Sequence, residues 1–180
     1  WEYGVWPASG EIDIMEHVGY DVNTVYSTIH TGAYNHTLGT DIGFEYESTT
    51  LETEFHVYEI EWEPGLIKSY IDGIHYATFF YNPTVSDGIV PSDAWPFDKQ
   101  FHLILNIAVG GNWGGSQGVD TDIWPQEMVV DYVRVYQKDY AYGDTENPSN
   151  VTDINASVTA NQAFVSWEKS TDNLEVKEYQ

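Results

Sequence analysis

The sequence predicts an all-β sandwich, in which each sheet has one face on a hydrophobic core and one face in solvent. Alternating or continuously apolar runs, typical of strands, dominate the chain, and Glu-Pro-Gly at 63–65 and Asp-Gly at 72–73 separate consecutive runs as turns. No stretch combines an amphipathic helical period with capping residues. With 180 residues, 42% of them hydrophobic, the chain can bury one sizeable core and a smaller piece.

The expected strands follow one another closely along the chain. In order, they are residues 11–18, 25–30, 55–62, 66–71, 75–81, 101–109 and 128–136. Short turns join the three runs between residues 55 and 81. These three runs therefore predict a β-meander.

The pattern changes near Lys138. Residues 138–148 are polar, turn-rich and without a hydrophobic period, so we expect a linker there. The first domain then covers residues 1–137, and residues 149–180 form a second, truncated piece. The expected strands of that piece are residues 151–158, 163–167 and, as the start of a third, 176–180.

Three carboxylates lie within six positions of the first strand-like run: Glu11, Asp13 and Glu16. Because side chains alternate between the faces of a strand, Glu11 and Asp13 share one face, whereas a regular strand would point Glu16 into the core. Burying an unpaired carboxylate there is costly. We therefore predict a β-bulge near Met15, which inserts one residue and brings Glu16 onto the face of the other two acids.

A row of three carboxylates can hydrolyse a glycosidic bond. One carboxylate attacks the anomeric carbon while another protonates the leaving oxygen, and retaining enzymes hold the two about 5–5.5 Å apart. Asp13, between the glutamates, would hydrogen-bond to one or both and keep their pKa values apart. The alternatives are a calcium site and a solvated strand edge, but calcium loops prefer turn-rich spacing with Gly and Asn.

Aromatic side chains near turns and strand ends could line a sugar-binding cleft, because sugar rings present apolar C–H faces that pack on aromatic planes. Five tryptophans have this placement: Trp6, Trp62, Trp95, Trp113 and Trp124. The candidates for substrate contact are Trp6, Trp95 and Trp113, the last within a glycine-rich loop. The sugar hydroxyls would need polar partners, for which the candidates are His30, Asn106 and Gln126. For any single tryptophan, packing in the core is the alternative.

Composition narrows the classes of partner and cofactor. The net charge is −23, from 29 acidic and 6 basic residues, so nucleic acid and anionic membranes are not expected as partners. The glycine-rich loop at 110–115 lacks the Lys and the following helix of a phosphate site, and the six histidines lack zinc spacing. No cysteine is present to form a disulfide or a thiolate site.

The acidic motif and its neighbours resemble one family. Trp-Pro-Ala-Ser-Gly-Glu-Ile-Asp-Ile-Met-Glu at 6–16 resembles the active-site signature of glycoside hydrolase family 16, and residues 55–73, 95–115 and 124–136 are similar to further blocks of that family. The resemblance covers about residues 1–137 and implies a jelly-roll β-sandwich (concanavalin-like) with a substrate cleft across its concave sheet. Family domains normally carry several strands before the Trp-Pro block, so the N-terminal strands are expected to be missing here.

The resemblance implies a role for each acid. Glu11 matches the nucleophile, Glu16 matches the acid/base, and Asp13 matches the acid that assists between them. Residues 28–36 and 106–113 resemble laminarinases, which cut β-1,3-glucans. By that resemblance, the residues in contact with glucose near the cleavage point would be Trp6, His30 and Trp113.

The expected function is therefore retaining endo-hydrolysis of β-1,3-glucan. The alternatives are a non-catalytic β-glucan-binding sandwich, and a mixed-linkage β-1,3/1,4-glucanase or galactan hydrolase of the same family. The strong negative charge favours a neutral glucan over a sulfated galactan.

The remaining expectations concern cofactors, assembly and the C-terminal piece. The chemistry requires no cofactor, while the structural calcium ion of many family members would use an Asp that matches Asp131. We expect a neutral polysaccharide as partner, a monomer, and a secreted, extracellular protein. The tail at 148–180 resembles the start of a fibronectin type III module, with Trp167 as its core tryptophan and Tyr179 on the third strand.

Overall fold

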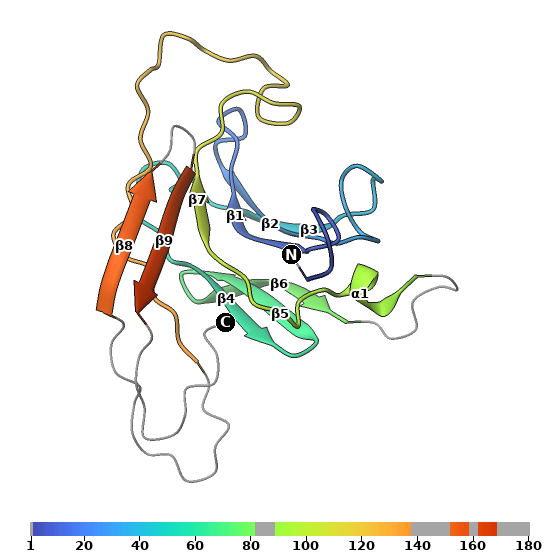
Figure 1. Ribbon diagram of the computed structural model, residues 1–180. Helices are drawn as coiled ribbons and strands as arrows, with labels where there is room; N and C mark the ends of the chain where they lie inside the picture. The colour runs from blue at the N-terminus through green and yellow to red at the C-terminus, as the bar shows by residue number, and fades with distance from the viewer. Residues whose placement is uncertain (1, 82–88, 138–151, 159–161, 169–180) are drawn as a thin grey trace. The chain divides into compact units, whose positions relative to one another are not determined.

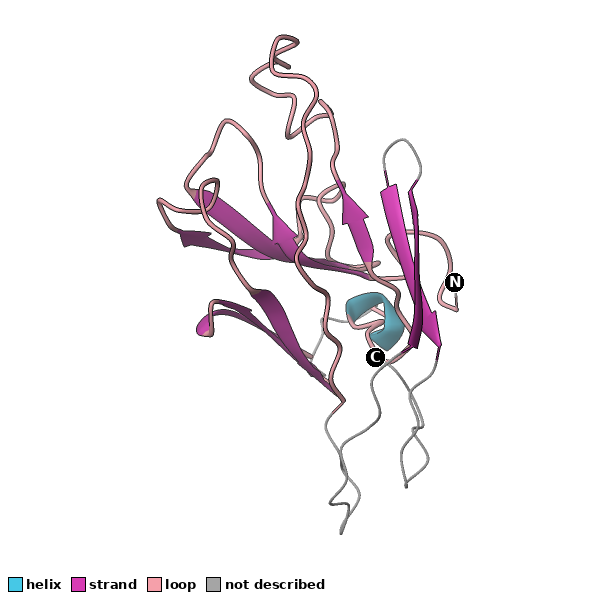
Figure 2. Ribbon diagram, turned by 90° about the vertical axis from the view of Figure 1, so that its left-hand side faces the viewer, coloured by secondary structure: helices cyan, strands magenta, loops and turns pink. Residues whose placement is uncertain are grey.

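The computed structural model describes residues 2–81, 89–137, 152–158 and 162–168 (Figure 1). The chain divides into two compact units, Trp1–Lys99 and Gln100–Gln180, and each is described by itself below. Strands make up most of the regular structure, as Figure 2 shows. The described helix, α1 (Pro91–Ala94), has four residues, and no helix of the described chain is long and apolar enough to cross a membrane.

The first sheet of the first unit has the strand order β1-β2-β3, with antiparallel neighbours. Its strands are β1 (Glu11–Glu16), β2 (Thr24–His30) and β3 (Ile42–Glu47). β1 and β2 confirm the first two expected strands, although β1 ends two residues earlier. β3 was not expected, because Gly43 interrupts its short alternating pattern and its apolar side chains stay largely exposed.

The second sheet has the order β4-β5-β6 and confirms the expected meander. Its strands are β4 (Tyr58–Glu63), β5 (Leu66–Ile71) and β6 (Ile74–Phe80). Asp72 and Gly73 connect the last two strands with φ angles of 50° and 76°. Two consecutive left-handed residues match the twist of a tight hairpin, which is why Asp-Gly marks the turn in the sequence.

The core of the first unit lies between its two sheets. From the first sheet, Val25 and Ile29 point inward, and from the second, Ile67, Ile71 and Phe79; all are at most 2% exposed. Two ring pairs also join β3 to β6: Phe44 with Phe79 at 5.3 Å between centroids, and Tyr46 with Tyr76 at 5.6 Å. The first unit is therefore a sandwich of two sheets packed through apolar faces.

The second unit has one described sheet, of order β7-β9-β8. Its strands are β7 (Ile104–Asn106), β8 (Thr152–Val158) and β9 (Gln162–Glu168). β8 and β9 confirm the strands expected at 151–158 and 163–167, and β7 is the central part of the strand expected at 101–109. The expected linker at 138–148 and the strand start at 176–180 lie outside the described residues.

The prediction of a strand at 128–136 is wrong. These residues form no strand in the structure, and all of them are exposed. An alternating sequence forms a strand only where another strand edge takes up its backbone hydrogen bonds, and among the described residues this segment has no such partner.

Candidate functional site

The three acids of β1 lie on one face because the strand carries the predicted bulge. Antiparallel pairing with β2 places Glu11 opposite His30 and Asp13 opposite Thr28, and then the register shifts before the next pair. Three steps along β1 from Asp13 to Glu16 correspond to two steps along β2, from Thr28 to Tyr26. One residue is therefore inserted, which brings Glu16 onto the face of the other two acids and leaves Met15 exposed.

Glu11, Asp13 and His30 form a tight cluster. Each offers one ligand-type atom, and these atoms all lie within 4.8 Å of one another. Within it, Nε2 of His30 lies 3.5 Å from Oδ2 of Asp13. The two side chains are only 9% and 16% exposed, so solvent screens their interaction weakly.

Burial favours the neutral forms of Asp13 and His30. Burial first, then the nearby charges of Glu16 and Glu11 and a hydrogen bond with Glu11, together raise the pKa of Asp13 to about 9. The pKa of Glu16 is also raised, chiefly by burial. Burial lowers the pKa of His30, against the opposing effect of Glu11. Asp13 and His30 are therefore a neutral pair near pH 7, although their distance is that of an ion pair.

The rings of Trp6, His30 and His36 lie together beside the acids and are called the aromatic shelf. Nε1 of Trp6 donates a 2.5 Å hydrogen bond to Oε2 of Glu11, which fixes one oxygen of that carboxylate. The Trp6 ring also stands 6.0 Å from the ring of His30 and 5.1 Å from the ring of His36. His30 and His36 contact each other edge to face at 5.1 Å.

His36 is the residue that sequence reasoning missed. It follows His30 by six positions, and a turn organised by Asn35 returns it toward β2. Asn35 is 1% exposed, its Oδ1 accepts from the backbone N–H groups of Thr37 and Leu38, and its Nδ2 donates to the carbonyl of Thr31. An Asn at such a turn was the available signal, because its side chain readily replaces backbone hydrogen bonds.

The structure thus brings together five of the predicted site residues: Trp6, Glu11, Asp13, Glu16 and His30. Trp95 also belongs to the first unit, but it is only 9% exposed and packs edge to face on Phe97 at 4.9 Å. The remaining predicted residues belong to the second unit, where all of them are exposed: Asn106, Trp113, Gln126 and Asp131. Their functional roles stay predictions.

Among the described residues, Glu11, Asp13 and His30 are the group of three that could hold a metal ion. Their donors are one imidazole nitrogen and two carboxylate oxygens, a set that suits a transition metal better than calcium. Asp131 belongs to no such group within the described chain. A calcium-binding role for Asp131 stays a prediction.

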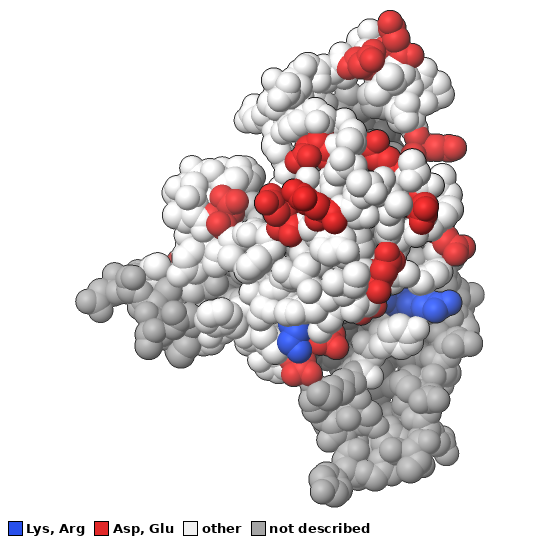
Figure 3. Space-filling model, turned by 180° about the vertical axis from the view of Figure 1, so that it is seen from behind, with Lys and Arg blue, Asp and Glu red and all other residues white. Residues whose placement is uncertain are grey.

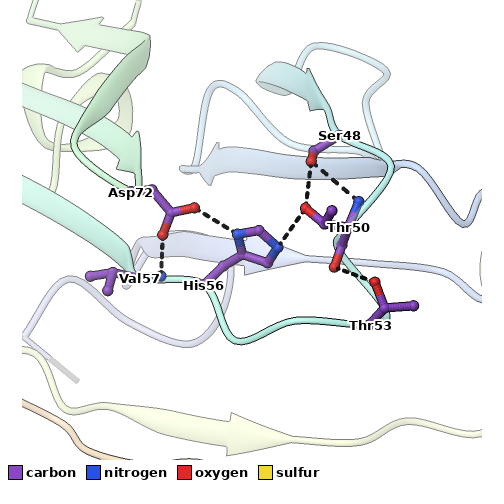
Figure 4. A network of polar contacts seen from close by, with 6 residues as sticks. All are labelled: Ser48, Thr50, Thr53, His56, Val57 and Asp72. Atoms are coloured by element: carbon purple, nitrogen blue, oxygen red, sulfur yellow. Dashed lines mark hydrogen bonds and ion pairs between the residues drawn. The ribbon is translucent and has the colours of Figure 1, made fainter.

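A second histidine–aspartate pair lies in the same unit, outside this cluster (Figure 4). Nδ1 of His56 is 2.6 Å from Oδ2 of Asp72, and Oδ1 of Asp72 accepts a 2.9 Å bond from the backbone N–H of Val57. On its other side, Nε2 of His56 is 3.1 Å from Oγ1 of Thr50, which in turn is 3.0 Å from Oγ of Ser48. The network ties the segment before β4 to the β5–β6 turn.

The fold and the site define a β-sandwich protein with a row of half-buried carboxylates beside an aromatic shelf. The chain belongs to Glycosyl hydrolases family 16, whose model matches residues 3–134. Members of this family are jelly-roll β-sandwiches, so the predicted fold class is confirmed.

Relatives of known name support the same assignment. The chain is 53% identical over 132 residues to the Beta-glucanase of Rhodothermus marinus, which covers 73% of this chain and 46% of that protein. It is 42% identical over 143 residues to Glucan endo-1,3-beta-glucosidase A1 of Niallia circulans, which covers 76% and 20%. The solved laminarinase of Rhodothermus marinus superposes with a TM-score of 0.63 at 49% identity, over 68% of this chain and 48% of that one. The chain spans less than half the length of each.

Proposed function

We propose that this chain carries the catalytic residues of a retaining endo-β-1,3-glucanase. The observation that carries the proposal is the bulge in β1, which brings Glu16 onto the face of Glu11 and Asp13. A bulge at this place has no evident benefit for packing, because it exposes Met15 and gathers acids whose charges disfavour one another. Retaining glycosidases need such a gathering of carboxylates.

In the first step, a carboxylate oxygen of Glu11 attacks the anomeric carbon. The bond from that carbon to the leaving oxygen breaks, and the proton of Glu16 passes to the leaving oxygen, which gives a glycosyl ester on Glu11 and a free sugar hydroxyl. The raised pKa of Glu16 favours the protonated form that this step needs. Trp6 holds Oε2 of Glu11 by its indole N–H, so the second oxygen is free to attack.

In the second step, the ionised Glu16 takes a proton from water, and the resulting nucleophile attacks the anomeric carbon. The ester bond to Glu11 breaks, Glu16 is protonated again, and two inversions leave the configuration unchanged. Asp13 remains protonated because of its pKa near 9, so it can donate a hydrogen bond to the Glu11 carboxylate without adding a second negative charge.

The surface of the chain and the names of its relatives support a neutral β-glucan as the substrate. Acidic side chains are scattered over the face shown in Figure 3, with few basic ones between them, and the net charge is −23. Such a surface repels a sulfated polysaccharide and is indifferent to a neutral glucan. Trp6, His30 and His36 offer ring faces beside the acids, on which a glucose ring can pack.

Azide rescue tests the two roles separately. With an activated aryl β-glucoside of a β-1,3-linked oligosaccharide, Glu11→Ala plus azide is expected to give the α-glycosyl azide, because azide replaces the missing nucleophile in one inversion. Glu16→Ala plus azide should give the β-glycosyl azide, because azide intercepts the ester on Glu11. Proton NMR of the products distinguishes the two, and Glu59→Ala on β4 is the control that should keep parent activity.

Removal of the nucleophile alone should cause a large loss of activity. Glu11→Gln should lower kcat at least about a thousandfold, equivalent to about 4 kcal/mol of transition-state stabilisation, while oligosaccharide binding changes little. Substantial activity in this variant would refute the assignment of the nucleophile. Binding of laminarin by the parent chain without new reducing ends would instead support the non-catalytic glucan-binding alternative.

Linkage preference needs a separate experiment, because a mixed-linkage glucanase and a galactan hydrolase of this family share the acids. Product profiles on laminarin, lichenan and agarose compare the three directly. We expect laminarin to be cleaved fastest. Substitutions in the aromatic shelf of the first unit should change this preference, and so should substitutions of Asn106, Trp113 and Gln126 in the second unit.

Several further expectations remain proposals. The chemistry above needs no cofactor, a structural calcium ion would involve Asp131, and the protein acts outside the cell as a monomer. The fibronectin type III-like module at 149–180 rests on the sequence pattern around Trp167 and Tyr179 alone. Calcium-dependent melting, sedimentation and expression of the chain in its host measure these properties one at a time.

A further inference from the structure

Two buried serines connect the sheets of the sandwich beneath the site. Ser27 on β2 and Ser69 on β5 are both 0% exposed, and their Oγ atoms are 2.7 Å apart. Ser69 interrupts an apolar stripe, because its neighbours on the same face of β5 are Ile67 and Ile71. A hydroxyl in such a stripe is unfavourable unless it is hydrogen-bonded, and Ser27 supplies Ser69 with a partner.

The hydroxyl pair ends on the catalytic strand. Oγ of Ser27 donates a 2.9 Å hydrogen bond to the backbone carbonyl of Asp13. A serine hydroxyl has one proton, and that of Ser27 is used in this bond, so Ser69 must be the donor to Ser27. The result is a directed chain from β5 through β2 to β1, in which each bond polarises the next.

The Asp13 carbonyl, at the end of this chain of hydrogen bonds, lies beside the bulge of β1. The register between β1 and β2 shifts directly after Asp13, before Glu16. A bulge locally interrupts the hydrogen bonds of the ladder, so backbone groups beside it need partners from elsewhere. Ser27 supplies one such partner from the core side, opposite the face that carries the acids.

We propose that Ser27 and Ser69 are positioning residues for the catalytic acids, holding the bulge of β1 so that Asp13 and Glu16 stay on the face of Glu11. The proposal rests on the function proposed above. Neither serine touches the reacting atoms; Ser69 acts through Ser27, and Ser27 acts through the backbone of Asp13.

The test compares three variants with a matched control. Ser27→Ala removes the hydroxyl that joins the Asp13 carbonyl to Ser69, and it should lower kcat tenfold or more while KM changes less than twofold. Ser69→Ala keeps the bond to Asp13 and should lower kcat two- to fivefold. The double variant should be no slower than Ser27→Ala, because Ser69 has no route to β1 except through Ser27. Ile67→Val is the control: it perturbs the same face of β5 and should lower the melting temperature without lowering kcat.

A second measurement keeps the proposal testable without turnover. Carboxyl carbon NMR titrations should show a changed pKa for Glu16 or Asp13 in Ser69→Ala and, if it folds, in Ser27→Ala, but the parent pKa in Ile67→Val. Equal loss of kcat in Ser27→Ala and Ile67→Val, or parent kcat and parent titrations in both serine variants, would overturn the proposal. A parent chain that binds glucans but releases no reducing ends would refute the proposed function instead, and the titrations would still decide the role of the serines.

Discussion

The first unit contains two histidine–aspartate pairs that behave in opposite ways. Between His30 and Asp13, at 3.5 Å, the pKa of the histidine is lowered and that of the aspartate is raised to about 9. Between His56 and Asp72, at 2.6 Å, the pKa of the histidine is raised and that of the aspartate is lowered. The same two residue types favour their neutral forms at the site and their charged forms at the β5–β6 turn.

Hydrogen bonds and solvent explain the difference. The Asp72 side chain is 45% exposed and accepts from the backbone N–H of Val57 as well as from His56, and both bonds favour its charged form. The Asp13 side chain is 16% exposed, its Oδ2 has no hydrogen-bond partner among the described groups, and two glutamates lie nearby. Burial without donors therefore outweighs the attraction of a nearby histidine.

Asp13→Asn is expected to change the free energy of unfolding more than any other substitution considered at these pairs. A carboxyl whose folded pKa is raised contributes stability that is complete below its usual pKa of 3.8 and is lost as pH rises toward 9. An amide of the same shape does not titrate, so the variant should unfold with a free energy higher than the parent's by more than about 1 kcal/mol at pH 7. Urea denaturation at pH 5, 7 and 9 measures this gain, which should grow with pH. A constant difference across that range would mean that Asp13 is already ionised in the folded protein.

Asp72→Asn should have the opposite sign and a smaller size. The raised pKa of His56 gives stability that is complete below about 6.5, and the lowered pKa of Asp72 gives stability that is complete above about 3.8. The pair therefore stabilises most between pH 4 and 6.5, and the variant should lose about 1 kcal/mol or less at pH 5, because Asp72 is half in solvent.

The backbone at residue 72 accepts this substitution without strain, so the loss of charge is the main change. Asp72 has φ of 50°, a conformation that Asn adopts as readily as Asp, and Asn keeps an oxygen for the N–H of Val57. Thermal melts of parent and variant at pH 5 and pH 8 provide the measurement. A loss that is as large at pH 8 as at pH 5 would show that the charge of His56 plays no part.

How far the sequence predicted these regions depended on whether the deciding contacts were local. The bulge could be predicted from β1 alone, because strand alternation and the cost of burying Glu16 both required an extra residue near Met15. The meander could be predicted because Asp72 and Gly73 specify their own turn.

Features that depend on distant partners could not be predicted in this way. Asn35 marks the turn before His36, but the contact that brings His36 to the site is made with the distant ring of Trp6. Ser69 reaches β1 through Ser27, 42 positions away in sequence. The strand expected at 128–136 failed for the same reason, because alternation says nothing about whether a partner edge is present. The opposite behaviour of the two histidine–aspartate pairs likewise depends on burial, which spacing in the sequence does not reveal.

The smallest effect is expected at a third acid–base pair, on the surface of the second sheet. Nζ of Lys68 is 3.2 Å from Oε2 of Glu61, with side chains 36% and 58% exposed. Solvent screens this attraction, and holding two long side chains together costs entropy, so Lys68→Gln should change the free energy of unfolding by less than about 0.5 kcal/mol. Urea denaturation in low and high salt measures the change, and the salt dependence should be the same in parent and variant. If Lys68→Gln lost as much stability as Asp72→Asn, burial would not explain the ranking of the three pairs by their contribution to stability. Neither Lys68 nor Glu61 is buried, whereas the His56 side chain is only 7% exposed.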